Sequence, residues 1–447
     1  MYKAAFLKKL PLETRSVHCV GIGGIGVSAI AGLLLEGGFS VSGSDIAINE
    51  NCRELQTKGA AVAPAGHRLE NLPGTECCAV ISTAAANMSN PEITAMLKRG
   101  AMFWSRGEFL GELCRCYQRP VMIAGSHGKS STTAMLGWIM KELSVNAGLL
   151  LGAKYQDVDS NYAVGNGDIL LAEADESDGT HALLSGELAL ITNIDGDHAW
   201  NAEQKIRQEK EFIRFAKNFR HVICIDSSKC RELLANLPNC EILPQERLEK
   251  LAAMTPEWML GYERSNAALA LAGAEYLKID LSKAAEALKS YPGIKRRQNE
   301  VFACGNIKVV EDYAHHPTEV AASLDVLHRR YPEYALTVVF QPHRSKRLQH
   351  YFNEFVEIFK NPQFSVIVLP VFSAWESVEI DAPDHKTLTA AINASGGNAA
   401  VAENDFSALA EDLAALQKKR EPQLIALIGA GDIENLTAHI KAVSVEH

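Results

Sequence analysis

Long apolar runs are absent from this sequence. Its 447 residues contain no stretch of about 18 uncharged apolar residues, and a membrane-spanning helix needs roughly 20. The opening segment, MYKAAFLKKLPLETRSVHCV, is too interrupted by polar residues to be a secretory signal. We therefore expect a cytoplasmic protein that has no membrane partner.

Cysteine pairs and basic runs are absent as well. The ten cysteines include no C-x-x-C pair and no Cys/His spacing typical of zinc, so we predict neither a disulfide framework nor a structural metal site. Lys and Arg number 44 against 54 Asp and Glu, which gives a net charge of −10. This balance argues against a nucleic-acid partner.

Short β-branched segments followed by longer helical patterns recur along the chain. Examples are SVHCV before SAIAGLLLEGG and PVMIAG before STTAMLGWIMKEL. The alternation predicts α/β domains with mostly parallel sheets. The length and the Pro-containing breaks near Pro120 and Pro292 predict three domains, over residues 1–117, 118–292 and 293–447.

A glycine-rich loop follows the first predicted strand. The segment GIGGIG, residues 21–26, is a G-x-G-x-x-G pattern between a strand and a helix, where backbone amides can approach a diphosphate closely. Asp45, after the next strand, is placed to accept a hydrogen bond from a ribose hydroxyl. The candidate nucleotide-binding residues are Gly23, Gly24, Ile25, Gly26, Ser44, Asp45, His67, Ser82 and Thr83. Two alternatives stay open, a turn made only for packing and an NAD(P)-dependent oxidoreductase.

A second phosphate-binding loop follows the strand PVMIAG. Its spacing is shorter than G-x-x-x-x-G-K-[ST], but glycines, a lysine and hydroxyls are all present between a strand and a helix. Lys129 is expected to meet the β- and γ-phosphates, and Ser130 to supply a hydroxyl to Mg²⁺. The candidate ATP-binding residues of this loop are Gly125, Ser126, His127, Gly128, Lys129, Ser130 and Ser131.

Acidic residues end the two following apolar strands. ILLA leads to Glu173 in EADESD, and LALITNI leads to DGDH with His198. Carboxylates at the ends of buried strands need cations, so Ser130 and Glu173 are predicted to bind Mg²⁺, and His198 to bind a second Mg²⁺ or to orient one. A phosphate loop beside metal ligands is typical of phosphoryl transfer.

The last third of the chain carries two further polar clusters after strands. DYAHHPTE contains Asp312, His315 and His316, and FQPHRSKR contains Arg344 and Arg347. Such groups on a separate domain can reach a reacting phosphate on domain closure. The alternatives are a helix cap for the histidines and a solvated basic turn.

Taken together, eight segments resemble the Mur ligase family in its order: GIGGIG with SGSD, GSHGKSSTT, EADESD, TNIDGDH, KRR, DYAHHPTE, FQPHRSKR and GAGDI. The resemblance implies an N-terminal Rossmann-like domain for a UDP-sugar, a central P-loop ATPase-type sheet and a C-terminal Rossmann-like domain. It implies ATP- and Mg²⁺-dependent ligation of L-alanine to the lactyl carboxylate of UDP-N-acetylmuramate, by a monomer or homodimer. Ser177, where a peptide-recycling relative would carry Tyr, favours the alanine-adding branch.

The resemblance also assigns roles to single residues. It adds Asn266 and Arg296 to the ATP site and gives the GxGxxG loop to the UDP diphosphate. The residues that it assigns to catalysis are Lys129, His198, Asp312, His315, His316, Arg344 and Arg347.

The sequence departs from the family pattern at several positions. The adenine-binding GxHNxxN is GYERSN here, with Asn266 retained. His181 and Gln298 each replace an expected Phe, and Ser373–Glu376 replaces an Ala-Gly-Glu turn. Lys210 stands where several sister ligases carry a carbamylated lysine, which the alanine-adding branch is not expected to have. A ligase for another amino acid or a peptide, and a catalytically silent nucleotide-binding relative, therefore stay open.

Overall fold

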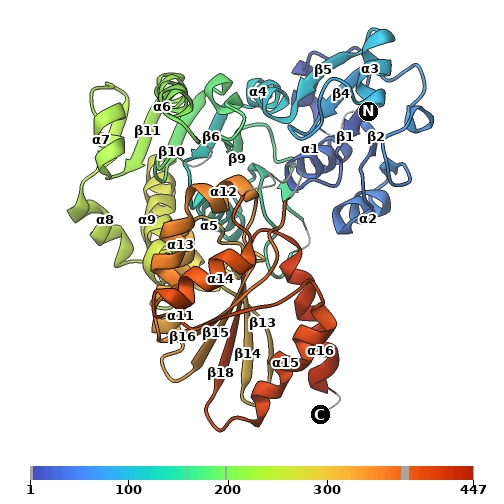
Figure 1. Ribbon diagram of the computed structural model, residues 1–447. Helices are drawn as coiled ribbons and strands as arrows, with labels where there is room; N and C mark the ends of the chain where they lie inside the picture. The colour runs from blue at the N-terminus through green and yellow to red at the C-terminus, as the bar shows by residue number, and fades with distance from the viewer. Residues whose placement is uncertain (1–3, 159, 197–198, 374–381, 446–447) are drawn as a thin grey trace. The chain divides into compact units, whose positions relative to one another are not determined.

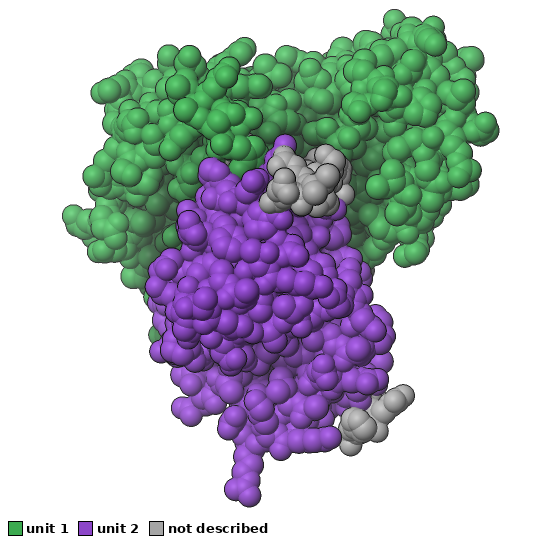
Figure 2. Space-filling view, in the orientation of Figure 1, with its two compact units in different colours: residues 1–293 green, residues 294–447 purple. Residues whose placement is uncertain are grey.

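Three sheets organise the protein. The computed structural model describes residues 4–158, 160–196, 199–373 and 382–445. The chain divides into two compact units, Met1–Gly293 and Ile294–His447 (Figures 1 and 2). Two sheets belong to the first unit and one to the second, which confirms the predicted α/β class; the domain boundaries stay predictions. Among the described residues, no helix combines the length and apolar character needed to cross a membrane.

The first sheet is parallel, with the strand order β3-β2-β1-β4-β5. Its strands are β1 Ser16–Val20, β2 Ser40–Ser44, β3 Ala61–Val62, β4 Ala79–Ser82 and β5 Met102–Ser105. The connecting helices are η1 Ala5–Lys9, α1 Ile25–Glu36, α2 Glu50–Thr57, η2 Leu69–Asn71, α3 Pro91–Lys98 and α4 Arg106–Cys116. The strand order reverses between β1 and β4, and ligands of open α/β sheets bind at such a point, beyond the carboxyl ends of the strands.

The second sheet has the order β12-β11-β10-β6-β9-β7-β8, and all neighbours are parallel except β7 and β8. Its strands are β6 Arg119–Ala124, β7 Gly148–Leu150, β8 Tyr162–Ala163, β9 Ile169–Glu173, β10 Gly186–Ile191, β11 Phe219–Ile225 and β12 Cys240–Leu243. Its helices are α5 Lys129–Glu142, η3 Thr180–Leu183, α6 Ala202–Lys217, α7 Ser228–Leu234, α8 Gln245–Ala252, α9 Gly261–Tyr276, α10 Leu281–Ala287 and η4 Leu288–Ser290.

The first two sheets are joined by buried contacts. Lys154, which is 6% exposed, extends its ammonium to Glu54 on α2 at 2.8 Å. Asn161 donates to the carbonyl of Ile25 at 3.1 Å. The ring of Tyr162 packs on α1 so closely that a Cβ on Gly32 would lie 2.1 Å from it. These contacts hold the two predicted nucleotide loops in one compact unit.

The third sheet has the order β13-β14-β18-β15-β16-β17, and only β13 is antiparallel to its neighbour. Helices α11 (Pro317–Arg330) and α13 (Phe352–Phe359) cover one of its faces, and α15 (Phe406–Ala414) and α16 (Asn435–Val445) cover the other (Figure 1). An apolar cluster fills each of these interfaces. Its strands are β13 Asn299–Cys304, β14 Ile307–Asp312, β15 Ala335–Phe340, β16 Phe364–Val368, β17 Ala399–Val401 and β18 Gln423–Ile428. Its helices are α11 Pro317–Arg330, α12 Ser345–His350, α13 Phe352–Phe359, α14 His385–Ala394, α15 Phe406–Ala414, η5 Ala415–Lys418, η6 Asp432–Glu434 and α16 Asn435–Val445.

Candidate functional site

The glycine loop lies at the carboxyl edge of the first sheet. Gly21 follows β1 with φ +77°, and a Cβ there would lie 2.4 Å from Thr83, just after β4. Gly24 is the N-cap of α1, and Ile25 and Gly26 form its first turn. Helix N-termini of this kind present amides to anions. The loop therefore has the geometry expected of a diphosphate site.

Asp45, directly after β2, and Ser82, at the end of β4, lie beside this loop on the two strands that flank β1. The Asp45 carboxylate accepts a hydrogen bond from the amide of Gly23 at 2.8 Å through Oδ2. Ser82, at the end of β4, is buried, and its hydroxyl donates to the carbonyl of Thr83 at 3.1 Å. Asp45 thus fixes the loop backbone in addition to the ribose contact that the sequence predicts for it.

Ser44 and His67 belong to one buried hydrogen-bond network. The hydroxyl of Ser44 lies 2.8 Å from Nδ1 of His67 and also contacts the carboxylate of Glu92. Glu92 in turn accepts from Nε2 of His18 at 3.2 Å and from the side-chain Nδ2 of Asn71 at 2.7 Å. The structure therefore brings the two predicted ligand residues together and adds a carboxylate that sequence reasoning missed.

The second loop wraps around the end of β10. The amides of Ser126 and His127 donate to Asn193, to its backbone and side-chain oxygens respectively, at 3.1 and 2.9 Å. Gly125 has φ +137°, and a Cβ there would lie 2.1 Å from the hydroxyl of Thr192. Gly128, with φ +81°, is the N-cap of α5, and Ser131 lies in the first turn of that helix. Glycine is needed at both positions, so the loop has the shape of a phosphate cradle.

Lys129 is held inside this loop. Its ammonium donates to the carbonyl of Gly125 at 2.7 Å and pairs with Glu176, also at 2.7 Å. Burial disfavours the charged amine, but the carboxylates of Glu176, Asp175 and Glu173 raise the pKa of Lys129. Burial raises the pKa of Glu176 to about 7, although Lys129 opposes the shift. Lys129 is therefore a fixed positive charge at the mouth of the loop.

Two oxygen ligands of the predicted metal site lie together. The hydroxyl of Ser130 is 2.8 Å from Oε2 of Glu173, at the carboxyl end of β9. Hydroxyl and carboxylate oxygens are the ligands that Mg²⁺ prefers, so this pair fits the metal. The third predicted ligand, His198, lies outside the described residues, and Lys210 is exposed on α6.

Arg106 connects the two loops of the first unit. It begins α4, and its guanidinium donates to Asp175 at 3.0 Å. A Cβ on Gly26 would lie 2.6 Å from Cδ of Arg106, so the side chain also lies against the glycine loop. Burial raises the pKa of Asp175, but Arg106 and Lys129 outweigh it and hold that pKa well below its usual range. Sequence reasoning missed Arg106.

Asn266 lies against the second loop from α9. Its side-chain oxygen is within 2.5 Å of the place that a Cβ on Gly128 would take. The residue is buried, whereas Tyr262, one turn earlier on the same helix, is 57% exposed. The altered GYERSN motif therefore keeps Asn266 beside the phosphate loop, and its contact with adenine stays a prediction.

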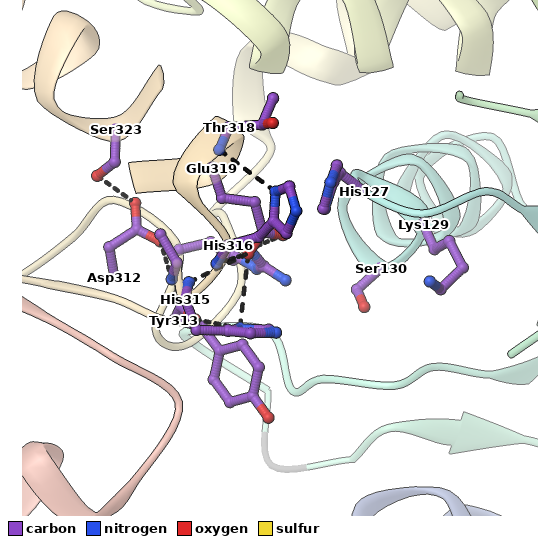
Figure 3. Close-up of polar contacts among 12 residues, drawn as sticks. His127, Lys129, Ser130, Asp312, Tyr313, His315, His316, Thr318, Glu319 and Ser323 are labelled. Carbon is purple, nitrogen blue, oxygen red and sulfur yellow. Dashed lines mark hydrogen bonds and ion pairs between the residues drawn. The ribbon is translucent and has the colours of Figure 1, made fainter. Parts of the chain in front are cut away.

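In the second unit, Asp312 ends β14 and is 6% exposed (Figure 3). It accepts hydrogen bonds from Ser323 at 2.8 Å, from Gln298 at 2.6 Å and from the amide of Ala314 at 3.0 Å. Burial raises the pKa of Asp312, which Arg297 and these donors oppose. Gln298, at φ +48°, replaces the expected Phe and supplies one of these donors.

His315 and His316 precede α11. His316 is the N-cap, accepts from the amide of Thr318 at 3.3 Å and forms a capping box with Glu319 (Figure 3). The ring of His315 lies 3.0 Å from the carbonyl of Tyr313 through Nδ1. The capping alternative is therefore correct for His316, and its catalytic role stays a prediction.

The predicted arginines of this unit are engaged within it. Arg296 donates to the carbonyls of Gly429 and Gly431 at 2.8 and 2.9 Å. Arg347 is 1% exposed and lies 3.2 Å from Nδ1 of His343. Arg344, at φ +68°, is the N-cap of α12. Their contacts with ATP, acyl phosphate or amino acid stay predictions.

Comparison with known proteins identifies the family. The model "Mur ligase family, catalytic domain" matches residues 16–118, and "Mur ligase, glutamate ligase domain" matches residues 296–431. The chain is 31% identical to the UDP-N-acetylmuramate–L-alanine ligase of Sorangium cellulosum, over 96% of each protein. The chain belongs to the Mur ligase family. This membership does not favour the oxidoreductase alternative.

Solved structures share the fold of this Mur ligase. The UDP-N-acetylmuramate–alanine ligase MurC of Thermotoga maritima superimposes with a TM-score of 0.76 at 24% identity, covering 97% of this chain and 100% of that one. A murein peptide ligase of Psychrobacter arcticus follows with a TM-score of 0.66 at 18% identity, covering 96% and 98%. These likenesses support the three-domain Mur ligase fold.

Proposed function

We propose that this Mur ligase uses ATP to join L-alanine to the lactyl carboxylate of UDP-N-acetylmuramate, in the cytoplasmic synthesis of peptidoglycan precursors. One observation carries the proposal. Within one compact unit, Arg106 contacts both the glycine loop, at Gly26, and Asp175 of the acidic segment beside Lys129. A sugar nucleotide on the first loop and a triphosphate on the second would then be neighbours. The names of the relatives support the donor and the acceptor.

The reaction follows from the chemistry of a carboxylate. Its oxygen is a poor leaving group, so the lactyl carboxylate first attacks the γ-phosphorus of ATP and releases ADP. The resulting acyl phosphate is attacked by the α-amine of L-alanine, and a tetrahedral intermediate collapses to the amide and phosphate. Negative charge moves onto ADP in the first step and onto the former carbonyl oxygen in the second, so fixed cations accelerate both.

Different residues of this chain act on the phosphates, on Mg²⁺ and on the acyl phosphate. Lys129 neutralises charge on the β- and γ-phosphates, and the amides of the first turn of α5 orient them. Ser130 and Glu173 would hold Mg²⁺, which supplies further charge neutralisation when bound. Asp312, His315 and His316 form the proposed catalytic face of the third domain. Arg344 and Arg347 are directed to the acyl phosphate or the amino-acid carboxylate, and Arg296 to phosphate.

Lys129→Ala tests this function. We expect ADP release in the presence of UDP-N-acetylmuramate and L-alanine to fall at least about a hundredfold, because a charge aimed at the transition state is lost. Binding of UDP-N-acetylmuramate, measured by calorimetry, should stay within about twofold. Lys141→Ala is the matched control, since Lys141 lies exposed on the same helix and contacts the ring of Trp138. Full turnover by Lys129→Ala would contradict the proposal.

The acceptor is tested separately with a panel of amino acids and the peptide L-Ala-γ-D-Glu-meso-diaminopimelate. Ligation of L-alanine in preference to the others supports the proposal, and preference for the peptide indicates a recycling ligase. Tight UDP-N-acetylmuramate binding without ADP release from any acceptor would identify a catalytically silent relative.

A further inference from the structure

Glu92 is a buried carboxylate for which the proposed mechanism has no use. It is the second residue of α3 and is 0% exposed. Its Oε1 accepts from the amide of Arg68 at 2.8 Å and from the side chain of Asn71 at 2.7 Å. Its Oε2 accepts from Ser44 and from His18. Burial raises the pKa of Glu92, but these four donors lower it to about 2. Glu92 is therefore ionised and can only accept hydrogen bonds.

This charge fixes the direction of the hydrogen bonds that lead to His67. Ser44 has one hydroxyl hydrogen, and its contact with the ionised Glu92 uses it. The oxygen of Ser44 must then accept from Nδ1 of His67, which lies 2.8 Å away. Nδ1 consequently carries the hydrogen. In a neutral imidazole the other nitrogen, Nε2, is then an acceptor.

The acceptor nitrogen is available to a ligand. The His67 side chain is 18% exposed, and no residue in the described ranges hydrogen-bonds Nε2. The loop that carries the ring is anchored, because the amide of Gly66 donates to the carbonyl of Asp45 at 2.7 Å. The side chain of Asn71 also holds the carbonyl of Gly66 at 2.8 Å. His67 is thus fixed next to Asp45, which holds the glycine loop.

We propose that Glu92, acting through Ser44, is a positioning residue that fixes His67 as a hydrogen-bond acceptor toward the sugar nucleotide. The inference rests on the proposed function for the identity of that nucleotide. An acceptor at Nε2 selects a donor group on the ligand. A uridine nucleotide offers two such sources, the N3–H of uracil and a ribose hydroxyl. Cytosine lacks a hydrogen on N3, and phosphate oxygens are acceptors, so neither matches Nε2.

The tautomer can be observed without any ligand. In protein labelled with ¹⁵N-histidine, the His67 resonances, assigned with His67→Gln, should show a protonated Nδ1 and an unprotonated Nε2. Ser44→Ala should lose this preference. Ser42→Ala is the matched control: Ser42 lies two residues earlier on β2 and contacts His18 at 2.9 Å instead of His67. A protonated Nε2 in the neutral ring of the unaltered protein would overturn the inference.

Binding supplies the second measurement. Calorimetry with UDP-N-acetylmuramate should show a loss of about three- to tenfold for Ser44→Ala and for Glu92→Gln, as expected for one hydrogen bond. Ser42→Ala should stay within about twofold. Ser44 is itself a predicted ligand residue, so Ser44→Ala can also remove a direct contact with the ligand. Glu92 is fully buried and cannot contact the ligand, so a loss of binding in Glu92→Gln reports its effect through Ser44 and His67. Should Glu92→Gln fail to fold, binding by Ser44→Ala and the tautomer measurement still show whether Ser44 orients His67.

Ligand analogues separate the two donor sources. N3-methyl-UDP removes the uracil donor, and 2′-deoxy- and 3′-deoxy-UDP remove the ribose donors. The analogue whose penalty shrinks in Ser44→Ala identifies the group that His67 contacts, and equal penalties for all three analogues in both proteins would overturn the inference. If the unaltered protein does not bind UDP-N-acetylmuramate, the proposed function fails while the tautomer result stands. If it binds and both variants bind equally well, the positioning role of Glu92 is wrong.

Discussion

His181 is a buried histidine whose surroundings disfavour its charge. It lies in η3 and is 1% exposed, and its ring packs on Phe212 and Phe215 of α6 at centroid distances of 5.0 and 5.7 Å. Neither ring nitrogen has a hydrogen-bond partner within the described part of the chain. Burial lowers the pKa of His181 from 6.5 to about 4, although Glu211, Asp175 and Asp178 oppose the shift.

This lowered pKa predicts that acid destabilises the protein through His181. His181 takes up its proton near pH 6.5 in the unfolded chain and only near pH 4 in the folded chain. The contribution of the neutral His181 to the free energy of unfolding is therefore fully present above pH 6.5 and is lost as the pH falls toward 4. One pKa unit is worth about 1.4 kcal/mol, so the whole loss is about 3 kcal/mol, of which about 2 kcal/mol is lost by pH 5.

His181→Phe tests the argument, because Phe keeps a ring between Phe212 and Phe215 but cannot be protonated. Urea unfolding gives the free energy of unfolding at pH 8 and at pH 5. The decrease in this free energy between the two pH values should be about 2 kcal/mol smaller for the variant than for the unaltered protein. His328→Phe is the control, because His328 is exposed. This substitution should leave the decrease in unfolding free energy between pH 8 and pH 5 as it is in the unaltered protein. Equal losses for His181→Phe and the unaltered protein would refute the reasoning.

Two further predictions concern residues that hold site carboxylates. Arg106→Gln removes the cation between Gly26 and Asp175 and should lower kcat/KM for UDP-N-acetylmuramate at least about tenfold in steady-state assays. Arg115→Gln is the control, because Arg115 lies on the same helix and is 65% exposed, and this substitution should leave kcat/KM unchanged. Ser323→Ala removes a donor to the buried Asp312 and should lower the free energy of unfolding by about 1–3 kcal/mol in urea titrations. An unchanged unfolding midpoint would show that Gln298 and the amide of Ala314 suffice.

The strand–glycine turn–helix geometry of both loops could be predicted from the sequence because its determinants are local, whereas the ligands of the loops stay predictions. Each needs a strand, glycines at a turn and a helix start within about a dozen residues, and the order of residues alone specifies these. The acidic segment after β9 was predictable for the same reason. The three-sheet α/β fold also follows from alternating strand and helix patterns.

Glu92 and Arg106 could not be predicted, because their partners are distant in sequence. Glu92 follows Asn90 and Pro91, so in the sequence it resembles an ordinary acidic residue at a solvated helix start. Its partner Ser44 is 48 residues away, and Asp175 is 69 residues from Arg106. Only the strand order brings these residues together. His18, a polar residue inside the apolar strand SVHCV, was the one local sign of the buried network.

The two glycine loops are built in the same way, which explains why glycine is prominent in both sequences. In each sheet the first glycine after a central strand has positive φ and packs against a threonine that follows the neighbouring strand. Gly21 after β1 meets Thr83 after β4, and Gly125 after β6 meets Thr192 after β10. The close approach turns the chain sharply, so the next helix starts at the carboxyl edge and directs its amides there. The first sheet adds Asp45 beside its loop and the second adds Lys129. Under the proposed function, this difference separates a site for a sugar nucleotide from one for a transferring phosphate.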